Sequence, residues 1–362
     1  MYCFIQSVHM KLIRSLVFFL FKNSTLPAIL IQLMKLTINE IAEIANVAKS
    51  TVSKALNGQK GVSEENRRRI LEIIDSMDYE PNASAKALAQ SKTGAIGLVI
   101  PHDTHYSLSG AYWAGIITAV ATEANKQGYN LLLIPQSDSP GSINPLEGII
   151  RKRSVDGLII GAEQIDLPSI ERLKTRGIPF VFLGKNPQID HWAVDVKNID
   201  GAQRVTSTLI ERGYKHIACI AGPEEYIYTR DRIQGFCSAL NIAGLDTSRI
   251  MYSYYSAYEA RKNTSLLLQK YPDIDAVFIA AGGEFVLNIL EVIRFSGISL
   301  KKLGVGAFDD YRVYDFLECP IIAAKQPIEE MGASISRTLF SLIDGQTPSP
   351  MFNEFDIELI LR

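Results

Sequence analysis

The sequence lacks every short motif that would assign a metal site, a disulfide framework or a familiar catalytic group. Of 362 residues, only four are cysteine and five are histidine. Cys3, Cys219, Cys237 and Cys319 lie far apart, without the spacing of a zinc or redox site. The histidines form no HExxH pattern, and no nucleophile–histidine or phosphate-loop motif occurs. We therefore expect free thiols, no metal, no cofactor and a protein that is not an enzyme.

Long apolar runs and an excess of one charge are also missing. The run Leu16–Phe21 is far shorter than the roughly 20 residues that cross a membrane. The chain has 37 basic and 39 acidic residues, a net charge of −2, so any contact with DNA must come from a local basic surface. Residues 1–33 carry no acid; we expect them to lie outside the functional protein, which would begin at Met34. A secretory signal is the alternative.

Residues 34–80 show helical periodicity in three pieces. Thr37 is a good N-cap for a helix with Ile38, Ile41 and Ala45 on one face. After a short turn, a second helix over 49–56 would place Val52, Ala55 and Leu56 inward and its polar residues outward. Ser63 caps a third helix, on which Arg67, Arg68 and Arg69 are expected to form a solvated face. The pattern predicts a helix-turn-helix; three helices packed for another purpose are the alternative.

From Thr93 onward, short apolar runs alternate with amphipathic segments long enough for crossover helices. This pattern is typical of doubly wound α/β sheets, and the number of runs predicts two of them, with a ligand site at the carboxyl ends of their strands. The expected strands cover 95–100, 129–134, 157–160, 180–183, 216–221, 276–280 and 303–308. The fold class is therefore a small all-α helix-turn-helix domain followed by an α/β core of two parallel-sheet lobes.

Several short motifs, taken in chain order, resemble those of one protein family. The stretches 37–42, 51–57, 62–63 and 79–83 resemble the amino-terminal signature of the lactose/galactose repressor (LacI/GalR) family, and 87–89 resembles its hinge. Later matches are 232–236, 308–310 and 325–327. The resemblance runs from about residue 36 to the end of the chain. It implies a periplasmic-binding-protein-like core behind the DNA-binding domain.

The resemblance implies a role for each matching position in the DNA-binding part. Lys49, Ser50 and Lys54 would contact bases from the recognition helix, since lysine and hydroxyl groups suit base edges. Leu88 would be pushed between base steps in the minor groove. The family often has a serine that caps the recognition helix where this chain has Ala48. It commonly has an arginine where this chain has Lys54. The positions that would hold phosphates are Thr37, Thr51, Ser53, Asn57, Tyr79 and Asn82.

In the core, the resemblance implies that Arg232, Asp309 and Tyr255 bind a small-molecule effector. A guanidinium and a carboxylate suit paired hydroxyls of a sugar or the edge of a purine, and an aromatic ring suits stacking. Each residue has a structural alternative: Arg232 could form an interface ion pair, Asp309 could cap a strand end, and Tyr255 could simply pack in the core. Gly184 and Gly282-Gly283 stand where relatives often have polar residues. A carbohydrate is our first expectation, and a larger or atypical ligand the other.

The expected organisation has five parts. Residues 1–33 are the extension, 34–80 the DNA-binding domain and 81–92 the hinge helix. Residues 93–190 with 323–350 form the N-terminal lobe, and 191–322 with 351–362 the C-terminal lobe.

We predict a transcriptional regulator, and more specifically a repressor, that is cytoplasmic and associated with the nucleoid. It would bind a palindromic double-stranded operator as a homodimer or a tetramer, without a membrane. The alternative function is a secreted or membrane-anchored solute-binding protein, which would have no use for residues 37–89.

Replacement of Leu88 by alanine tests the hinge assignment. A wedge that unstacks a base step contributes only where the bent operator is bound. Leu88→Ala should weaken specific operator binding at least about tenfold while leaving binding to random duplex nearly unchanged. Titration of both duplexes in one buffer measures this, and equal losses on the two duplexes would contradict the wedge role.

Overall fold

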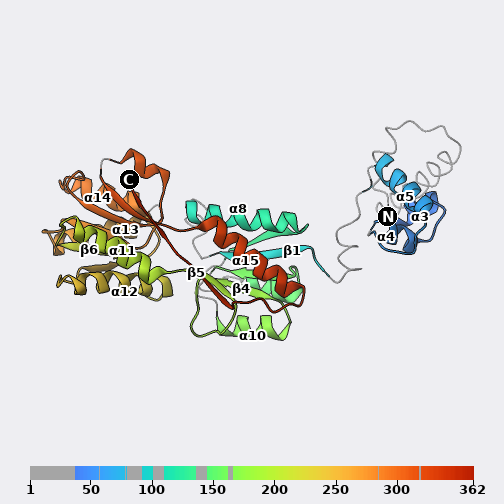
Figure 1. Cartoon of the computed structure of the whole chain (residues 1–362), viewed down its shortest axis with the longest axis horizontal. Helices are drawn as coiled ribbons and strands as arrows, with labels where there is room; N and C mark the ends of the chain where they lie inside the picture. Colours follow the sequence, from blue (N-terminus) through green and yellow to red (C-terminus); the bar gives the residue numbers. More distant parts are fainter. Residues whose placement is uncertain are drawn as a thin grey trace, which may run out of the picture. The chain divides into compact units, whose positions relative to one another are not determined.

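The computed structural model describes residues 37–56, 58–77, 79, 92–100, 110–135, 145–161, 166–283, 285–317 and 319–362. The chain divides into two compact units, 1–91 and 92–362 (Figure 1). Four expectations lie outside the described residues: the extension 1–33, the hinge residues 81–91 with Asn82 and Leu88, Asn57, and Cys3. Cys219, Cys237 and Cys319 are free thiols, as expected. Among the described residues, no helix has both the length and the hydrophobicity to span a bilayer.

The described residues of the first unit form three helices: α3 (Ile38–Ile44), α4 (Lys49–Leu56) and α5 (Glu64–Ser76). Thr37 starts α3 with a capping box, because its hydroxyl accepts from the Glu40 N–H while the Glu40 carboxylate accepts from the Thr37 N–H. Ser63 caps α5 in the same position. A small core closes between the helices, built on Ile41, Ala42, Ala45, Val52, Ala55 and Ile70. The expected helix-turn-helix is confirmed.

The arginine triplet on α5 is a solvated face only in part: Arg68 and Arg69 are exposed, but Arg67 and Arg69 also bond to backbone carbonyls. Arg67 donates to the carbonyl oxygens of Ala55 and Gln59, 3.2 and 2.7 Å away. Arg69 donates to the carbonyl of Ala45, at the end of α3. Arg68 is exposed beside Glu72. Two of the three guanidinium groups therefore satisfy carbonyls that the helix ends leave without an intrahelical partner.

Residues 92–362 contain two six-stranded sheets, each with helices on both faces (Figure 1). The first sheet has the order β11-β5-β4-β3-β1-β2, and all its neighbouring strands are parallel. We call this sheet and its helices the first lobe. Its elements are β1 (Ala95–Ile100), α8 (Ala111–Lys126), β2 (Asn130–Pro135), α9 (Pro145–Lys152), β3 (Gly157–Ile160), α10 (Leu167–Thr175), β4 (Phe180–Leu183), β5 (Ala193–Val196), α15 (Ile328–Ile343) and β11 (Phe352–Phe355).

The second sheet has the order β12-β10-β9-β8-β6-β7, and only β12 runs antiparallel to its neighbour. We call this sheet and its helices the second lobe. Its elements are α11 (Asn198–Glu211), β6 (Ile217–Ala221), α12 (Ile227–Ile242), β7 (Ile250–Tyr252), α13 (Ala257–Lys270), β8 (Ala276–Ile279), α14 (Phe285–Phe295), β9 (Gly304–Phe308), η1 (Arg312–Phe316), β10 (Ile321–Lys325) and β12 (Glu358–Leu361). The expected fold class of two parallel-sheet lobes is confirmed.

The chain crosses between the lobes at points other than the expected boundaries. Ala193–Val196 and Phe352–Phe355 belong to the first sheet, although 191–322 and 351–362 were assigned to the other lobe. All of Ile321–Lys325 belongs to the second sheet, although 323 was the expected boundary. The three crossovers therefore fall near Lys197, Gln326 and Asp356. Strand periodicity shows that a strand is buried, but it does not show which of two sheets the strand joins.

Helices α11 and α12 pack very closely on one face of the second sheet. The reason is Gly235 in α12, where a Cβ atom would lie 2.1 Å from the Ile199 carbonyl oxygen and 2.9 Å from the Gln203 nitrogen. Both are backbone atoms of α11, which cannot move aside as a side chain can. The close approach brings the first turn of α11, at the crossover from the first lobe, against the half of α12 that carries Arg232.

Gly235→Ala should lower the stability of residues 92–362 by at least about 2 kcal/mol, because the new methyl group forces two helices apart. Gly148→Ala is the matched control: Gly148 is in α9, and its Cβ would meet nothing within 4 Å. That variant should gain up to about 1 kcal/mol from helix propensity. Thermal unfolding followed by circular dichroism measures both variants. Similar melting temperatures for the two would contradict the close-packing argument.

Candidate functional site

The outer face of α4 presents the three residues expected to contact bases. Lys49, Ser50 and Lys54 are exposed, while Val52 and Ala55 are buried against α3 and α5. Because Ser50 and Lys54 are four residues apart, they are neighbours on one face of the helix. The helix contains no acid, so its two lysines give it a local positive charge on a chain whose net charge is negative. This face can donate hydrogen bonds to base edges or phosphates.

The residues expected at phosphates divide into four groups. Thr51 and Ser53 are half-buried on α4 beside the exposed lysines. Thr37 is exposed at the start of α3, and its hydroxyl already accepts the capping bond from Glu40. Tyr79 packs against the core of the first unit, and burial raises the pKa of its phenol. Asn57 and Asn82 lie outside the described residues, so their positions remain predictions.

Ala48 precedes α4 at the cap position, as the sequence suggested. Its carbonyl oxygen accepts from the N–H groups of Thr51 and Val52, at 2.8 and 3.3 Å. Its methyl side chain cannot accept from the first turn, whereas the caps of α3 and α5 do. The recognition helix therefore begins without the side-chain bond that fixes the other two helices.

Arg232 is buried on α12 and holds the second lobe to a crossover. Its Nε donates to Asn198 Oδ1 at 2.9 Å, and one Nη donates to the Ala280 carbonyl at 2.8 Å. Its guanidinium carbon lies 3.6 Å from the centre of the Phe308 ring and 4.9 Å from that of Tyr228. Asn198 continues the chain of bonds, since its Nδ2 donates to Asp195 Oδ1 at 3.0 Å. Arg232 is thus held in one orientation, with donors left over on its second Nη.

Asp309 follows β9 and is also buried, with a positive φ of 71° that aspartate adopts more readily than most residues. Its carboxylate accepts from Gln326 Nε2 and from the Tyr311 hydroxyl. Burial raises the pKa of this carboxyl, while the Arg232 charge and the hydrogen bonds, including one from the Gly283 backbone, favour the ionised form. The site therefore holds a carboxylate whose charge is only partly compensated.

The glycine pair at 282–283 is explained by this carboxylate. Both residues have positive φ, 73° and 66°. A Cβ atom on Gly282 would lie 2.5 Å from Asp309 Oδ2. The loop after β8 therefore passes directly over Asp309, and its backbone supplies contacts where a side chain would not fit.

Tyr255 follows β7 and is linked to the same cluster through Tyr228. The two hydroxyl oxygens are 2.6 Å apart, and the Tyr255 hydroxyl also donates to the Ala281 carbonyl at 3.3 Å. Tyr228 in turn lies against the Arg232 guanidinium. The three residues expected to bind an effector are therefore brought together at the carboxyl ends of β6–β9. We name Arg232, Tyr228, Tyr255 and Asp309 the Arg232 cluster.

Three contributors were not assigned a role from the sequence. Tyr228 could have been found, because it is four residues before Arg232 and so shares its helix face. Gln326 was part of a noted motif without an assigned partner. Asn198 gave no signal, since its bond to Arg232 joins positions 34 residues apart.

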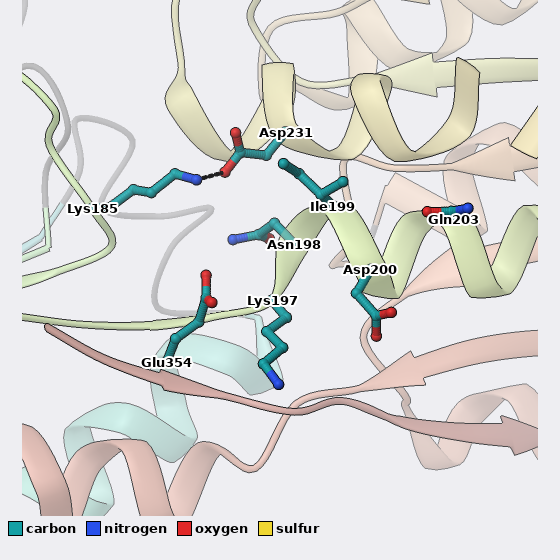
Figure 2. Close-up of a pocket in the computed structure, with 8 residues that line it drawn as sticks. All are labelled: Lys185, Lys197, Asn198, Ile199, Asp200, Gln203, Asp231 and Glu354. Atoms are coloured by element: carbon teal, nitrogen blue, oxygen red, sulfur yellow. Dashed lines mark ion pairs between the residues drawn. The ribbon is translucent and has the colours of Figure 1, made fainter. Parts of the chain in front are cut away.

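A pocket of about 280 Å³ opens beside this cluster, where the lobes meet (Figure 2). We call it the hinge pocket. Asn198 belongs both to its lining and to the bonds that orient Arg232. Eight residues line it, seven of them with polar or charged side chains: Lys185, Lys197, Asn198, Ile199, Asp200, Gln203, Asp231 and Glu354. Within the described ranges, no group of three histidine, cysteine or acidic residues is placed to hold a metal.

Comparison with known protein families matches both units. The family described as bacterial regulatory proteins, lacI family, matches residues 37–82. The family described as periplasmic binding proteins and sugar binding domain of LacI family matches residues 93–354.

Individual proteins agree with these matches. The transcriptional regulator CelR of Thermobifida fusca is 31% identical over 334 residues, covering 90% of this chain and 97% of CelR. DegA of Bacillus subtilis (strain 168) is 26% identical, covering 84% of this chain and 90% of DegA. Among solved structures, a CelR–cellobiose complex superposes with a TM-score of 0.68 at 28% identity, covering 90% of this chain and 98% of that one. A lac repressor dimer bound to operator shares the fold, with a TM-score of 0.77 at 22% identity and the same coverage.

A helix-turn-helix unit with an exposed basic face, followed by two parallel-sheet lobes, defines a DNA-binding transcriptional regulator with a periplasmic-binding-protein-like sensor. The relatives found are transcriptional regulators, and none of them supports the alternative of a secreted solute-binding protein. The chain belongs to the LacI family of bacterial regulatory proteins.

Asp309→Asn should make the effector-free core more stable at neutral and higher pH. Burial raises the pKa of Asp309, so the ionised carboxylate opposes folding above that pKa, and the wild type is stabilised as the pH falls toward it. Asparagine tolerates the positive φ and does not titrate. The gain in stability of Asp309→Asn over the wild type should therefore be largest near pH 8 and should decrease as the pH falls.

Melting temperatures of both proteins between pH 5 and pH 8 test this prediction. Glu358→Gln is the control, because that carboxylate is exposed and pairs with Lys325 on the surface. A lower melting temperature for Asp309→Asn at pH 8 would contradict the proposed burial effect.

Proposed function

We propose that this chain is an operator-binding repressor whose affinity for DNA is set by a carbohydrate bound at the Arg232 cluster. The observation that carries the proposal is the presence, in one chain, of an exposed basic helix and a buried arginine–carboxylate–tyrosine cluster beside the pocket where two lobes meet. The parts are those that such regulation needs: a surface for DNA, a site for a small molecule, and two bodies able to move.

The DNA contact would place α4 in the major groove. Lys49, Ser50 and Lys54 are exposed on one side of the helix and would contact base edges, while Thr51 and Ser53 flank them toward the backbone. Thr37, Asn57, Tyr79 and Asn82 would hold phosphates, and Leu88 would enter the minor groove. Lysine at position 54 offers a single cationic group rather than a two-pronged fork, which favours a base preference different from that of an arginine.

The effector class follows from the chemistry of the cluster. The free donors of Arg232 and the carboxylate of Asp309 fit neighbouring hydroxyls, and the rings of Tyr228 and Tyr255 offer an apolar surface for a sugar face. CelR, the 31% identical relative, has been solved with cellobiose. A β-linked disaccharide is therefore the first compound to test.

Communication with the DNA would pass through the point where the linker joins the core. The Thr93 and Gly94 N–H groups donate to the Asp156 carboxylate at 2.7 and 2.9 Å. Lys92 donates to Asp344, the C-cap of α15, at 3.2 Å. Helix α15 starts next to Gln326, which bonds to Asp309. One helix thus spans from the proposed effector site to Lys92, the last residue of the expected hinge.

A homodimer is the proposed working form, since a palindromic operator presents two equivalent half-sites. Val313 and Phe316 support it: they are three residues apart on η1, so they share a face, and they are 41% and 85% exposed. A tetramer remains a second possibility for the assembly. We further propose that the protein works in the cytoplasm at the nucleoid and catalyses no reaction.

Selection of the purified full-length protein on random duplex DNA tests the function. We expect a palindromic consensus bound by two chains per duplex, with affinity that falls steeply with salt. Lys54→Ala should weaken that binding by about 1–3 kcal/mol and relax the preference at one base pair of each half-site.

Lys126→Ala is the matched control, since Lys126 is an exposed lysine on α8, outside the DNA-binding unit, and pairs with Glu123 of the same helix. That variant should bind the consensus like the wild type. Cellobiose added to the complex should change operator affinity, and purines and monosaccharides show whether the response is selective. If no enriched sequence emerges at low salt, the proposed function fails.

A further inference from the structure

We propose that the ion pair between Lys185 and Asp231 is an electrostatic latch that holds the two lobes closed across the hinge pocket. Figure 2 shows the two side chains meeting over the pocket from opposite lobes. Lys185 lies on the loop after β4, in the first lobe, and Asp231 lies on α12, in the second. The contact therefore joins two bodies that the chain otherwise connects only at three crossovers.

The position of the pair separates it from the other charges of the pocket. Lys197 pairs with Asp356, 2.7 Å away, and both belong to crossovers that act as pivots. Asp200 lies 3.5 Å from Arg204 of the same helix. The Glu354 carboxylate is exposed on β11 and interacts electrostatically with Lys197. Among the ion pairs of the described residues, Lys185–Asp231 alone joins parts of the two lobes that lie off the crossovers.

The contact is shielded from solvent more than an ordinary surface pair. The side chains of Lys185 and Asp231 are 32% and 13% exposed. The loop of Lys185 is itself fixed, because its backbone N–H donates to the buried Asp195 carboxylate at 3.1 Å. Asp231 adjoins Arg232, which is locked by its own bonds. The backbone that carries each charge is thus held in place.

Opening of the lobes would break the pair and return both charges to water. The latch therefore favours the closed arrangement by the difference between the paired and the solvated charges, and a change in either charge shifts the balance. Its effect on effector affinity rests on the function proposed above, because a closed core is the form that would enclose a ligand. Its effect on lobe closure does not.

Distances between two spin labels test the latch in the effector-free, full-length protein. One label goes on Thr175→Cys of α10 and the other on Ile242→Cys of α12; both positions are exposed, and each lies at the end of a helix in a different lobe. Cys3 and Cys237 are replaced by serine, while Cys219 and Cys319 are buried. Labelled chains are diluted with unlabelled protein, so that only distances within one chain contribute.

Asp231→Asn should lower the ratio of closed to open core roughly two- to tenfold, visible as a second population at a different distance. Asp231→Lys should shift it further, and Lys185→Asp together with Asp231→Lys should restore the wild-type distribution. Glu291→Gln is the matched control, since it removes an ion pair to Arg261 inside the second lobe, and it should change nothing.

Coinciding distributions for the wild type and Asp231→Asn would overturn the latch. A shift in Asp231→Lys that the double reversal does not reverse would also overturn it. Cellobiose titrations of the same proteins separate the two proposals. If Asp231→Asn opens the core while cellobiose binds neither protein, the carbohydrate effector fails and the latch stands.

Discussion

Arg232 is the side chain on which the arrangement of the core depends. Its guanidinium bonds to Asn198 at one crossover and to the carbonyl at the end of β8, and it packs on Phe308 at the end of β9. A charged group is expensive to bury unless its donors are used, and here two bonds and an aromatic face compensate for most of that cost. In this way one residue fixes the end of the second sheet relative to the segment that enters it from the first lobe.

Two buried carboxylates depend on the position of Arg232. Asp195 and Asp309 are both buried carboxylates with raised pKa values, and for both the Arg232 charge opposes the effect of burial. Asp195 lies in the first lobe and Asp309 in the second. The Arg232 guanidinium therefore interacts with one carboxylate from each lobe. Such a partly compensated cluster is sensitive to any ligand that brings hydroxyl groups, because new hydrogen bonds would change the balance of charge and solvation. The tight packing of α11 on α12 at Gly235 keeps this cluster in register.

The two ends of the regulator are built on different principles. The DNA-binding unit is small, and its core is closed by six buried side chains together with arginine bonds to the helix ends. The sensor is large and relies on extensive apolar cores, one of which includes buried residues of both lobes. Recognition of DNA therefore uses exposed side chains on a rigid helix, whereas recognition of a ligand uses buried groups that a moving lobe can cover.

Local pattern was enough for much of the protein. The bounds of α4, the caps Thr37 and Ser63, and seven of the twelve strands follow from periodicity and capping, which involve residues only a few positions apart. The exposed face of Lys49, Ser50 and Lys54 follows for the same reason. What only the tertiary structure decided involves long separations: which sheet β5 and β11 join, why residues 282 and 283 must be glycine, and how Asn198 and Tyr228 connect Arg232 to its neighbours. The ion pair of Lys185 with Asp231 belongs to the same group, because charges on separate lobes meet only when both lobes are in place.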